Sequence, residues 1–506
     1  MGGTSHFVPF WGTKWLFLYK LINRKGGYTM IEISKKVFVE KKKEGRIFSV
    51  ISEFRGDEIT PIRIFKALDG KRKFIFESGE RRNLEGRYSF ISENPYLEIV
   101  EDKVDSIEKL KKEINKDFDL ESNPLPFKGG AIGYFAYDTV GFYEKSIKIT
   151  NVDKLGFPKV RFNFYSRYIA YDHLKNKAYI VDNVFPEDNR SYEEVKNKQI
   201  EYFNSILNKR TEIEEISSID TFNKDNFIKE DKEILELKYD DSNEEFIKNI
   251  MRAKQYIREG DIFQVVLSRR MKIKTEKTPL ELYRRLREDN PSPYMYLLDY
   301  DEYQVIGSSP EILVSIKDNS ITINPIAGTR KRGINYSEDL LLEEDLKNDN
   351  KELAEHVMLV DLSRNDVGKV SKISTVEVKD FMKIERFSHV MHITSKVTGE
   401  LNDDVDKIDA LFSCFPAGTV SGAPKIRAMQ IIDELESLNR GIYSGAIGYL
   451  SYGNNLELCI AIRTILLKNN NAYIQAGAGI VYDSIPEKEC EEIDNKLNIL
   501  KEVIIK

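Results

Sequence analysis

Residues 294–328, YMYLLDYDEYQVIGSSPEILVSIKDNSITINPIAG, decide the fold class. They hold four short runs rich in β-branched and aromatic residues, and only a few turn-forming residues separate one run from the next. Strands joined by such short turns run antiparallel, because a parallel connection needs a crossover of a dozen or more residues. The stretch therefore predicts antiparallel sheets built from hairpin-like neighbours.

The same pattern extends in both directions from this stretch. Further strand-like runs are KFIFES, GRYSFIS, AYIVDNVF, FQVVLSRR, GAIGYLSY, LELCIAIRTILL and AYIQAGAGIVYD. Helices are fewer. One is predicted to begin at a capping box formed by Ser242 and Glu245 and to end at Gly260, a second to run from about 424 to 438, and a third to close the chain. Because strands and helices do not alternate as βαβ units, the predicted class is α+β, a large body of antiparallel β-sheets with flanking helices.

Composition excludes several classes of function. The 506 residues are 41% hydrophobic and 32% charged, and no apolar run is long enough to span a membrane, so we expect a cytoplasmic protein with no membrane partner. A formal net charge of -6 disfavours nucleic acid as a partner. The three cysteines show no metal-ligand or disulfide spacing.

Four segments are predicted along the chain. Residues 1–29 hold both tryptophans and precede Met30, which opens an ordinary protein start; we interpret them as a non-native or disordered extension, with translation starting at Met1 or at Met30. Residues 30–208 form an N-terminal region, and 209–243 are a polar, highly charged linker or excursion. Residues 244–506 form a second region.

Residues 415–429, FPAGTVSGAPKIRAM, form a glycine-rich turn leading into a helix. Such a turn can expose backbone amides to an anion, but it can equally be a structural turn. A nucleotide-binding P-loop is disfavoured because Lys425 has no Ser or Thr after it.

Several acidic and basic residues are candidates for chemistry, although each has a structural alternative. Glu355 and Glu492 are consistent with solvated helix faces or, if they converge, with a magnesium site. Glu311 is either a turn cap or a general acid. His392 is either structural or catalytic, and Arg463 with the AGAG stretch at 476–479 offers a fork and backbone amides for a carboxylate.

Taken in order, the motifs closely resemble those of the chorismate-utilising enzymes over about residues 244–504, with a fainter resemblance over 45–190. The motifs are GDIFQVVLSRR, SSPEIL, NPIAGTRKRG, AEHVMLVDLSRND, HVMHITSKVTGEL, FPAGTVSGAPKIRAM, IRT and QAGAGIVYDSIPEKECEEIDNK. The resemblance implies the fold predicted above, a chorismate-binding catalytic region at 244–506 and a regulatory region at 30–208.

Two positions distinguish the branches of this family. Isochorismate and salicylate synthases carry a water-activating lysine where this chain has Gln264, and aminodeoxychorismate synthases carry a nucleophilic lysine where this chain has Ala327. The chain is therefore most similar to anthranilate synthase component I, which uses ammonia and makes anthranilate and pyruvate from chorismate, the first step of tryptophan biosynthesis. The alternatives are aminodeoxychorismate synthase component I and a non-catalytic tryptophan-binding paralogue.

The resemblance also implies the roles of individual residues. Magnesium would be bound by Glu355 and Glu492, with help from Glu489. The catalytic residues would be Glu311, His392, Thr329 and Thr419. The substrate would be held by Gly328, Tyr443, Arg463, Gly477, Ala478, Gly479 and Lys496.

Finally, the resemblance implies two further binding partners. A glutamine amidotransferase subunit would supply ammonia in a hetero-oligomer, because no glutaminase nucleophile motif is present in this sequence. L-Tryptophan would inhibit by feedback, at a site formed by Glu77, Ser78, Pro293, Tyr294, Met295, Gly448 and Tyr449.

Overall fold

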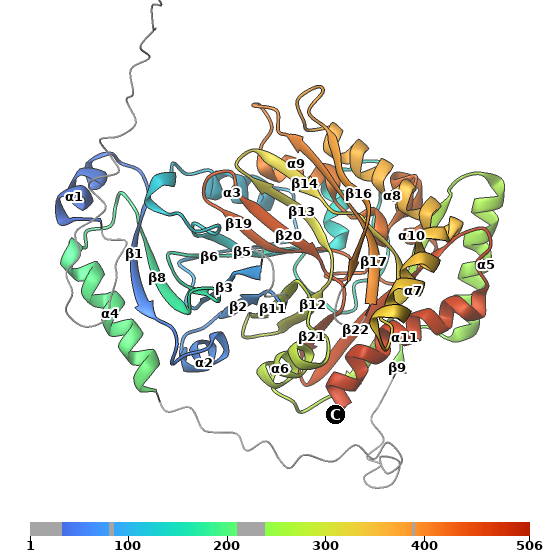
Figure 1. Ribbon diagram of the computed structural model, residues 1–506, viewed down its shortest axis with the longest axis horizontal. Coiled ribbons are helices and arrows are strands. Elements are labelled where there is room, and N and C mark those ends of the chain that lie inside the picture. Colours follow the sequence, from blue (N-terminus) through green and yellow to red (C-terminus); the bar gives the residue numbers. More distant parts are fainter. Residues whose placement is uncertain (1–32, 80–85, 210–237, 387–389, 506) are drawn as a thin grey trace, which may run out of the picture.

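The computed structural model describes residues 33–79, 86–209, 238–386 and 390–505 (Figure 1). The predicted extension at 1–29 and residues 210–237 of the predicted linker lie outside the described residues. Residues 238 and 239 at the end of that linker form a short strand that pairs with β10.

The N-terminal region contains short strands with flanking helices. Its elements are α1 (Lys35–Lys43), β1 (Phe48–Arg55), α2 (Pro61–Ala67), β2 (Phe74–Glu77), β3 (Tyr88–Ser92), β4 (Leu97–Glu101), α3 (Asp105–Ile114), η2 (Leu120–Ser122), β5 (Gly130–Phe135), η3 (Tyr137–Phe142), β6 (Val160–Tyr165), β7 (Arg167–Asp172), β8 (Lys177–Val184) and α4 (Tyr192–Asn208).

The second region contains the longer strands and helices. Its elements are β9 (Lys238–Tyr239), α5 (Asn243–Glu259), β10 (Gln264–Lys274), α6 (Pro279–Asp289), β11 (Tyr294–Asp299), β12 (Gln304–Ser309), β13 (Ile312–Lys317), β14 (Ser320–Ile323), β15 (Ile326–Lys331), α7 (Tyr336–Asn348), α8 (Asn350–Gly368), β16 (Glu377–Arg386), β17 (Val390–Glu400), α9 (Lys407–Cys414), η4 (Gly418–Val420), β18 (Gly422–Ala423), α10 (Lys425–Leu435), β19 (Ala446–Ser451), β20 (Leu456–Ile460), β21 (Thr464–Lys468), β22 (Asn471–Ile480) and α11 (Pro486–Ile505).

Two large sheets organise these strands, and the predicted α+β class with antiparallel sheets is confirmed. The first sheet has the order β1-β8-β7-β3-β2-β11-β12-β21-β22-β10-β18, with β9 paired to β10, and the second has the order β15-β17-β14-β13-β20-β19-β5-β6-β4, with β16 paired to β17. Neighbouring strands are antiparallel wherever the register is described, for example between β10 and β22 and between β15 and β17.

Both regions contribute strands to both sheets. In the first sheet β2 of the N-terminal region pairs with β11, with Phe76 opposite Tyr296. In the second sheet β5 pairs with β19, with Gly133 opposite Gly448. The hydrogen bonds of the sheets therefore run continuously across the predicted boundary.

An aromatic cluster fills the space between the two sheets in the N-terminal half of the body. It contains Phe90 and Tyr168 from the first sheet and Tyr134 and Tyr449 from the second. The rings of Phe90 and Tyr449 meet edge to face with centroids 6.2 Å apart. The sheets are thus packed face to face through aromatic side chains.

The predicted helices form, with small differences at their ends. Ser242 caps α5 by accepting a hydrogen bond from the Glu245 amide at 3.1 Å, which is one of the two bonds of the predicted capping box, and Gly260 ends the helix in the left-handed conformation, as predicted. The helix predicted at 424–438 is α10, which is shorter and has Pro424 as its N-cap. No helix among the described ranges is long and apolar enough to cross a membrane.

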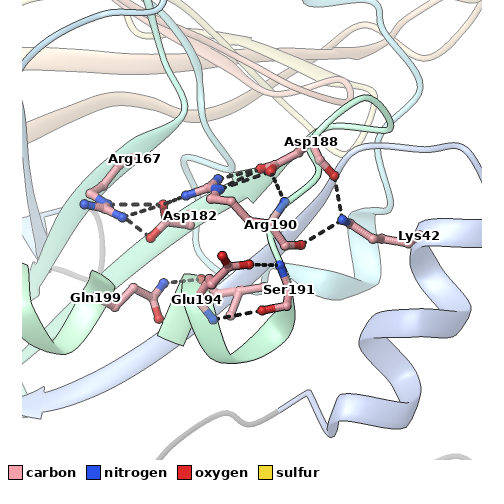
Figure 2. Close-up of polar contacts among 9 residues, drawn as sticks. Lys42, Arg167, Asp182, Asp188, Arg190, Ser191, Glu194 and Gln199 are labelled. Atoms are coloured by element: carbon pink, nitrogen blue, oxygen red, sulfur yellow. Dashed lines mark hydrogen bonds and ion pairs between the residues drawn. The ribbon is translucent and has the colours of Figure 1, made fainter. Parts of the chain in front are cut away.

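Helix α4 is fixed to the sheet by a polar network that Figure 2 shows. A capping box joins Ser191 and Glu194 at its start. The buried carboxylate of Asp182 on β8 pairs with Arg167 at 2.9 Å and with Arg190 at 3.4 Å. Because both arginines share one carboxylate, the turn before α4 is held against strands β7 and β8.

Candidate active site

Strand β15 contains an irregularity that sets the orientation of one candidate catalytic pair. The register between β15 and β17 shifts between Ala327 and Thr329. Gly328, which lies at this shift, has a φ of 70°, in the left-handed region where glycine has no steric penalty. After this bulge, Thr329 lies directly opposite His392 on β17.

The imidazole of His392 is held in one orientation by this bulge. Its Nδ1 lies 3.1 Å from the carbonyl oxygen of Gly328 and 3.0 Å from Oγ1 of Thr329. A carbonyl oxygen only accepts, so Nδ1 carries the proton and Nε2 is the unprotonated nitrogen of the neutral ring. Desolvation lowers the pKa of His392, the bond to Gly328 opposes this shift, and the positive charge of Arg463 adds to it. The ring is therefore neutral at pH 7 and can accept a proton.

Glu311 lies in the turn between β12 and β13, next to the glycine-rich loop. Its carbonyl oxygen accepts a hydrogen bond from the Ile460 amide at 3.0 Å. Its carboxylate Oε1 accepts a hydrogen bond from the Thr419 hydroxyl at 2.9 Å. Desolvation raises the pKa of Glu311 to about 7, although the bond from Thr419 opposes the rise. A large fraction of this side chain is therefore protonated at neutral pH and can act as an acid.

The lysine of the glycine-rich loop has a structural partner. Nζ of Lys425 lies 2.6 Å from Oδ2 of Asp366 on α8 and 3.0 Å from the carbonyl oxygen of Cys414. This ion pair ties the start of α10 to α8, consistent with the argument against a P-loop. The group that the loop presents to Glu311 is the hydroxyl of Thr419.

Arg463 is a poorly solvated cation between β20 and β21. It has a φ of 49°, which is uncommon for a residue other than glycine. Its Nη1 donates to Oδ1 of Asn290 at 3.1 Å, a neutral partner, and desolvation lowers its pKa. Within the described part of the chain, the ion pairs of the structure include none to Arg463. A desolvated guanidinium with a neutral partner is suited to bind an anion from outside the chain.

Two glycines of β22 allow polar side chains to approach the strand closely. A Cβ at Gly477 would lie 2.9 Å from Oη of Tyr443, and a Cβ at Gly479 would lie 2.5 Å from Nε2 of Gln264. Nζ of Lys496 donates to the carbonyl oxygen of Gly477 at 2.8 Å. A larger residue at either position would displace these groups.

A pair of carboxylates lies on α8. Oε1 of Glu355 accepts a hydrogen bond from Nε2 of Gln264 at 3.3 Å, which places Glu355 beside β10. Desolvation raises the pKa of Glu352, one turn earlier, and the charge of Glu355 raises it further. Glu352 was not among the predicted site residues, although its spacing of three residues from Glu355 in KELAEH is the signal that could have identified it.

A second pair of carboxylates lies on α11. Oε1 of Glu492 is 2.7 Å from Nζ of Lys496. Desolvation raises the pKa of Glu489, a hydrogen bond to Ser484 opposes this, and the charge of Glu492 adds to the rise. The charge of Lys351 on α8 also acts on Glu489, so the start of α8 lies within electrostatic range of this helix.

These residues fit a magnesium ion in their donor chemistry. The charge of Glu355 raises the pKa of Glu352, and the charge of Glu492 raises the pKa of Glu489, so each pair contains a repulsion that a bound cation would relieve. No group of three or more His, Cys, Asp or Glu side chains is gathered for a metal within the described ranges. Magnesium commonly uses only one or two carboxylates, together with water and oxygens of the substrate. The carboxylates therefore suffice if the ligand supplies the remaining oxygens.

Three of the residues predicted to bind tryptophan, Glu77, Tyr294 and Met295, lie on strands of the first sheet but not all on one face. The carboxylate of Glu77 accepts a hydrogen bond from the Tyr283 hydroxyl at 2.7 Å and pairs with Arg287 at 3.1 Å, both on α6. Met295 is paired with Glu77 and points to the same face. The next residue back, Tyr294, packs against the aromatic cluster on the other face.

The remaining predicted tryptophan contacts lie at the ends of strands or in the second sheet. Gly79, which follows Ser78, donates to the carbonyl oxygen of Ser292, which precedes Pro293, at 2.8 Å. Gly448 and Tyr449 lie on β19, and Tyr449 belongs to the aromatic cluster. A ligand that contacted the side chains of both Glu77 and Tyr449 would have to span the first sheet.

The contacts place the predicted site residues in local groups. Glu311 meets Thr419, His392 meets Thr329 and Gly328, and Glu355 meets Gln264 beside Gly479. Lys496 joins Glu492 to Gly477. Ala478 is paired with Leu267 and fully buried, so only its backbone can face a ligand.

The chain is also similar in sequence to known proteins. Residues 71–502 match the family described as chorismate binding enzyme. The chain is 45% identical to anthranilate synthase component 1 of Acetivibrio thermocellus over 484 residues, which cover 91% of this chain and 96% of that protein.

Two solved structures share the fold. Anthranilate synthase component I from Streptococcus pneumoniae TIGR4 superposes with a TM-score of 0.72 at 39% identity, covering 88% of this chain and 98% of that one. The menaquinone-specific isochorismate synthase of Escherichia coli superposes with a TM-score of 0.68 at 19% identity, covering 93% of this chain and 98% of that one, a likeness of fold.

Proposed function

Since the chain belongs to the chorismate binding enzyme family, we propose that it is component I of an anthranilate synthase, which converts chorismate and ammonia to anthranilate and pyruvate. Relatives of that name match most of the chain at 45% and 39% identity. The observation that carries the proposal from the structure itself is the state of two side chains, a partly protonated Glu311 and a neutral His392.

The two side chains have opposite pKa shifts. In water a glutamate has a pKa of about 4.3 and a histidine of about 6.5, so at neutral pH the glutamate would be ionised and could not donate a proton. In this chain desolvation raises the pKa of Glu311 and lowers that of His392. A single pH can therefore support an acid and a base together, as a reaction with one protonation and one deprotonation requires.

The substrate would be held mainly through its carboxylates. Arg463, with its neutral partner Asn290, provides a fork for the enolpyruvyl carboxylate, and Tyr443 and Lys496 lie beside the backbone of Gly477. The backbone amides near Gly479 would add hydrogen bonds to the same group. Thr329 and Thr419 would line the ring.

Glu355 and Glu492 would hold magnesium, with Glu352 and Glu489 nearby. When bound, the ion would neutralise the ring carboxylate of chorismate and fix its position. Lys496 would then have to move from Glu492 or share it.

The first chemical step assigns Glu311 as the general acid. Ammonia forms a bond to the ring carbon beside the one that bears the carboxylate, the ring double bonds shift, and the bond to the ring hydroxyl breaks. The hydroxyl leaves as water with the proton of Glu311, and the new ammonium group loses a proton to solvent to become the amino group. The product retains the enolpyruvyl group. The hydrogen bond from Thr419 stabilises the carboxylate that Glu311 becomes.

The second step assigns His392 as the base. Nε2 removes the proton from the carbon that bears the new amino group, the bond between the ring and the enolpyruvyl oxygen breaks, and the ring becomes aromatic. The leaving group is the enolate of pyruvate, which takes up a proton at its methylene carbon to become pyruvate. The carbonyl oxygen of Gly328 stabilises the resulting imidazolium through Nδ1.

Two positions favour ammonia over other nucleophiles. The side-chain amide of Gln264 donates a hydrogen bond to Glu355, and it contains no basic amine that could activate water. Ala327 lies on β15 before the bulge, and its methyl group cannot attack the ring as a lysine would. Aminodeoxychorismate synthase component I is the second candidate, and it would give a product that keeps its enolpyruvyl group.

The ammonia would come from a glutamine amidotransferase subunit that binds this chain.

We further propose feedback inhibition by L-tryptophan bound near the aromatic cluster, where Tyr294 and Tyr449 lie. Replacing Tyr449 with Ala should weaken inhibition strongly, whereas Glu77→Gln should weaken it little, because the carboxylate of Glu77 already binds α6. Equal effects of the two changes on inhibition would contradict this placement.

The function is tested by incubating the purified chain with chorismate, magnesium and ammonium and by following anthranilate fluorescence. Mass spectrometry identifies the products, and EDTA provides the control without metal. We expect the chain to form anthranilate and pyruvate when ammonium is supplied. We expect no anthranilate when glutamine is the only nitrogen source. Isochorismate, or an amino product that keeps its enolpyruvyl group, would assign the chain to another branch, and no turnover would favour a non-catalytic tryptophan-binding paralogue.

A further inference from the structure

Arg440, which follows helix α10, is buried behind the candidate active site. It is 2% exposed, and its guanidinium donates four hydrogen bonds. Two go to the carboxylate of Glu436, at 2.8 and 2.6 Å. The others go to the carbonyl oxygens of Val420, at 2.7 Å, and Val266, at 2.6 Å.

Each of these carbonyl oxygens belongs to a segment that carries a candidate site residue. Val420 directly follows Thr419, the hydrogen-bond donor to Glu311. Val266 lies on β10 opposite Gly479 of the glycine strand. The guanidinium also lies 5.8 Å from the ring centroid of Tyr443.

The guanidinium is itself held from both sides. Burial disfavours its charge, but the carboxylate of Glu436 outweighs this and the pKa of Arg440 is raised. Glu436 accepts further hydrogen bonds from the amide and the hydroxyl of Ser268 on β10, at 2.8 and 2.9 Å. On the other side, the ring centroid of Tyr137, from η3 of the N-terminal region, lies 4.8 Å away.

The N-terminal region also fixes the backbone next to Arg440. The amide of Gly441 donates to Oδ2 of Asp138 at 2.8 Å, and the carbonyl oxygen of Gly441 accepts from the amide of Tyr137 at 2.8 Å. Gly441 has a φ of 60°, so the chain turns here, two residues before Tyr443.

We propose that Arg440 is a positioning residue, which fixes the Thr419 loop, strand β10 and Tyr443 relative to one another so that Glu311 and the substrate carboxylate meet their partners. This inference rests on the proposed function. A buried ion pair is by itself weak evidence for stability, since apolar replacements are often as stable. An arginine is needed here because its planar guanidinium donates to a carboxylate and to two carbonyl oxygens in different directions at once. The compact ammonium group of a lysine cannot reach all of these acceptors.

The test compares Arg440→Lys with a matched control, Arg269→Lys. Arg269 is equally buried at 2% exposure, pairs with Asp241 at 2.9 Å and lies 4.0 Å from the ring centroid of Tyr239. Both changes keep the charge and remove a buried fork, so both should lower thermal stability. Only the change at Arg440 should alter the geometry around Thr419 and Tyr443.

Three readouts separate positioning from stability. For Arg440→Lys we expect the KM for chorismate to rise about tenfold and the basic limb of the kcat profile to shift upward by about one pH unit, because Tyr443 and Thr419 lose their positions. Hydrogen exchange should also become faster in peptides covering 264–268 and 417–423. Arg269→Lys should leave all three at wild-type values.

The outcomes distinguish this inference from the proposed function. If wild-type protein does not turn over chorismate, the proposed function fails, and hydrogen exchange alone decides whether Arg440 orders the two segments. If Arg440→Lys does not fold, Glu436→Gln is used, with smaller effects expected in the same direction. The proposal would be overturned if Arg440→Lys, or Glu436→Gln in its place, changed every readout by the same amount as Arg269→Lys.

Discussion

The hydrogen bond between Thr419 and Glu311 gives the sharpest prediction of the proposed mechanism. Replacing Thr419 with Val removes the hydroxyl that donates to Oε1 of Glu311 at 2.9 Å while keeping nearly the same shape. A hydrogen bond to a charged group contributes about 1.5–3 kcal/mol and one to a neutral group about 0.5–1.5 kcal/mol, so the ionised form loses about 1–1.5 kcal/mol more than the acid. This difference corresponds to about one pH unit.

The sign follows from the role of the group. Glu311 has a pKa of about 7 in the intact protein. Loss of a donor to the carboxylate disfavours ionisation, so the pKa of Glu311 rises in the Thr419→Val variant to about 8. A general acid is active only when it is protonated, so the basic limb of kcat must move to higher pH. At pH 8 the variant should retain about half of its own plateau rate, whereas the wild type should retain about a tenth of its own.

The assay is the pH dependence of kcat, measured by anthranilate fluorescence with saturating chorismate and magnesium. The concentration of unprotonated ammonia is held constant, because otherwise the titration of ammonium would distort the limb. Thr419→Ser, which keeps the hydroxyl, serves as the control and should show a limb near that of the wild type. A limb that stays in place or moves to lower pH in Thr419→Val would refute the assignment of Glu311 as the acid under the control of Thr419.

Three further predictions test other parts of the site. Arg463→Gln should raise the KM for chorismate about tenfold to a hundredfold in steady-state kinetics, since a charge-assisted bond to the substrate carboxylate is lost; an unchanged KM would exclude Arg463 from binding. His392→Gln should lower the rate of anthranilate formation about 10²–10⁴-fold, and mass spectrometry should detect an amino intermediate that keeps its enolpyruvyl group; loss of activity without that species would argue against His392 as the base of the second step. Lys425→Met should reduce the free energy of unfolding by about 1.5–3 kcal/mol in denaturant titrations, because the buried carboxylate of Asp366 loses the nearer of its two lysine partners and keeps only Lys369 at 3.2 Å; a loss below about 1 kcal/mol would show that this pair is not a stabilising link between α8 and α10.

Part of the site could be predicted because the sequence motifs are specific. The strand and helix positions of His392, Glu355 and Glu492 followed from local patterns, and the resemblance of eight ordered motifs supplied their roles. Glu352 could also have been identified, since it lies one turn before Glu355.

Other features could not be predicted, because they depend on segments far apart in the chain. The pKa of Glu311 depends on its desolvation and on Thr419, which lies 108 residues away. The opposite orientations of Glu77 and Tyr294 depend on the register of β2 against β11, which pairs Glu77 with Met295 rather than with Tyr294. The sequence shows only one partner of Arg440, Glu436, which lies four residues earlier. The other two partners are backbone carbonyl oxygens of distant segments, which carry no signal because every residue has such a group.

The sequence by itself determined the class of fold, because short β-rich runs with turns between them can form only antiparallel sheets. It also determined the branch of the family, through the identities of Gln264 and Ala327. The tertiary structure decided the order of the strands, in which both regions share both sheets. It also decided the protonation states of Glu311 and His392, because desolvation and distant hydrogen-bond partners exist only once the chain has folded.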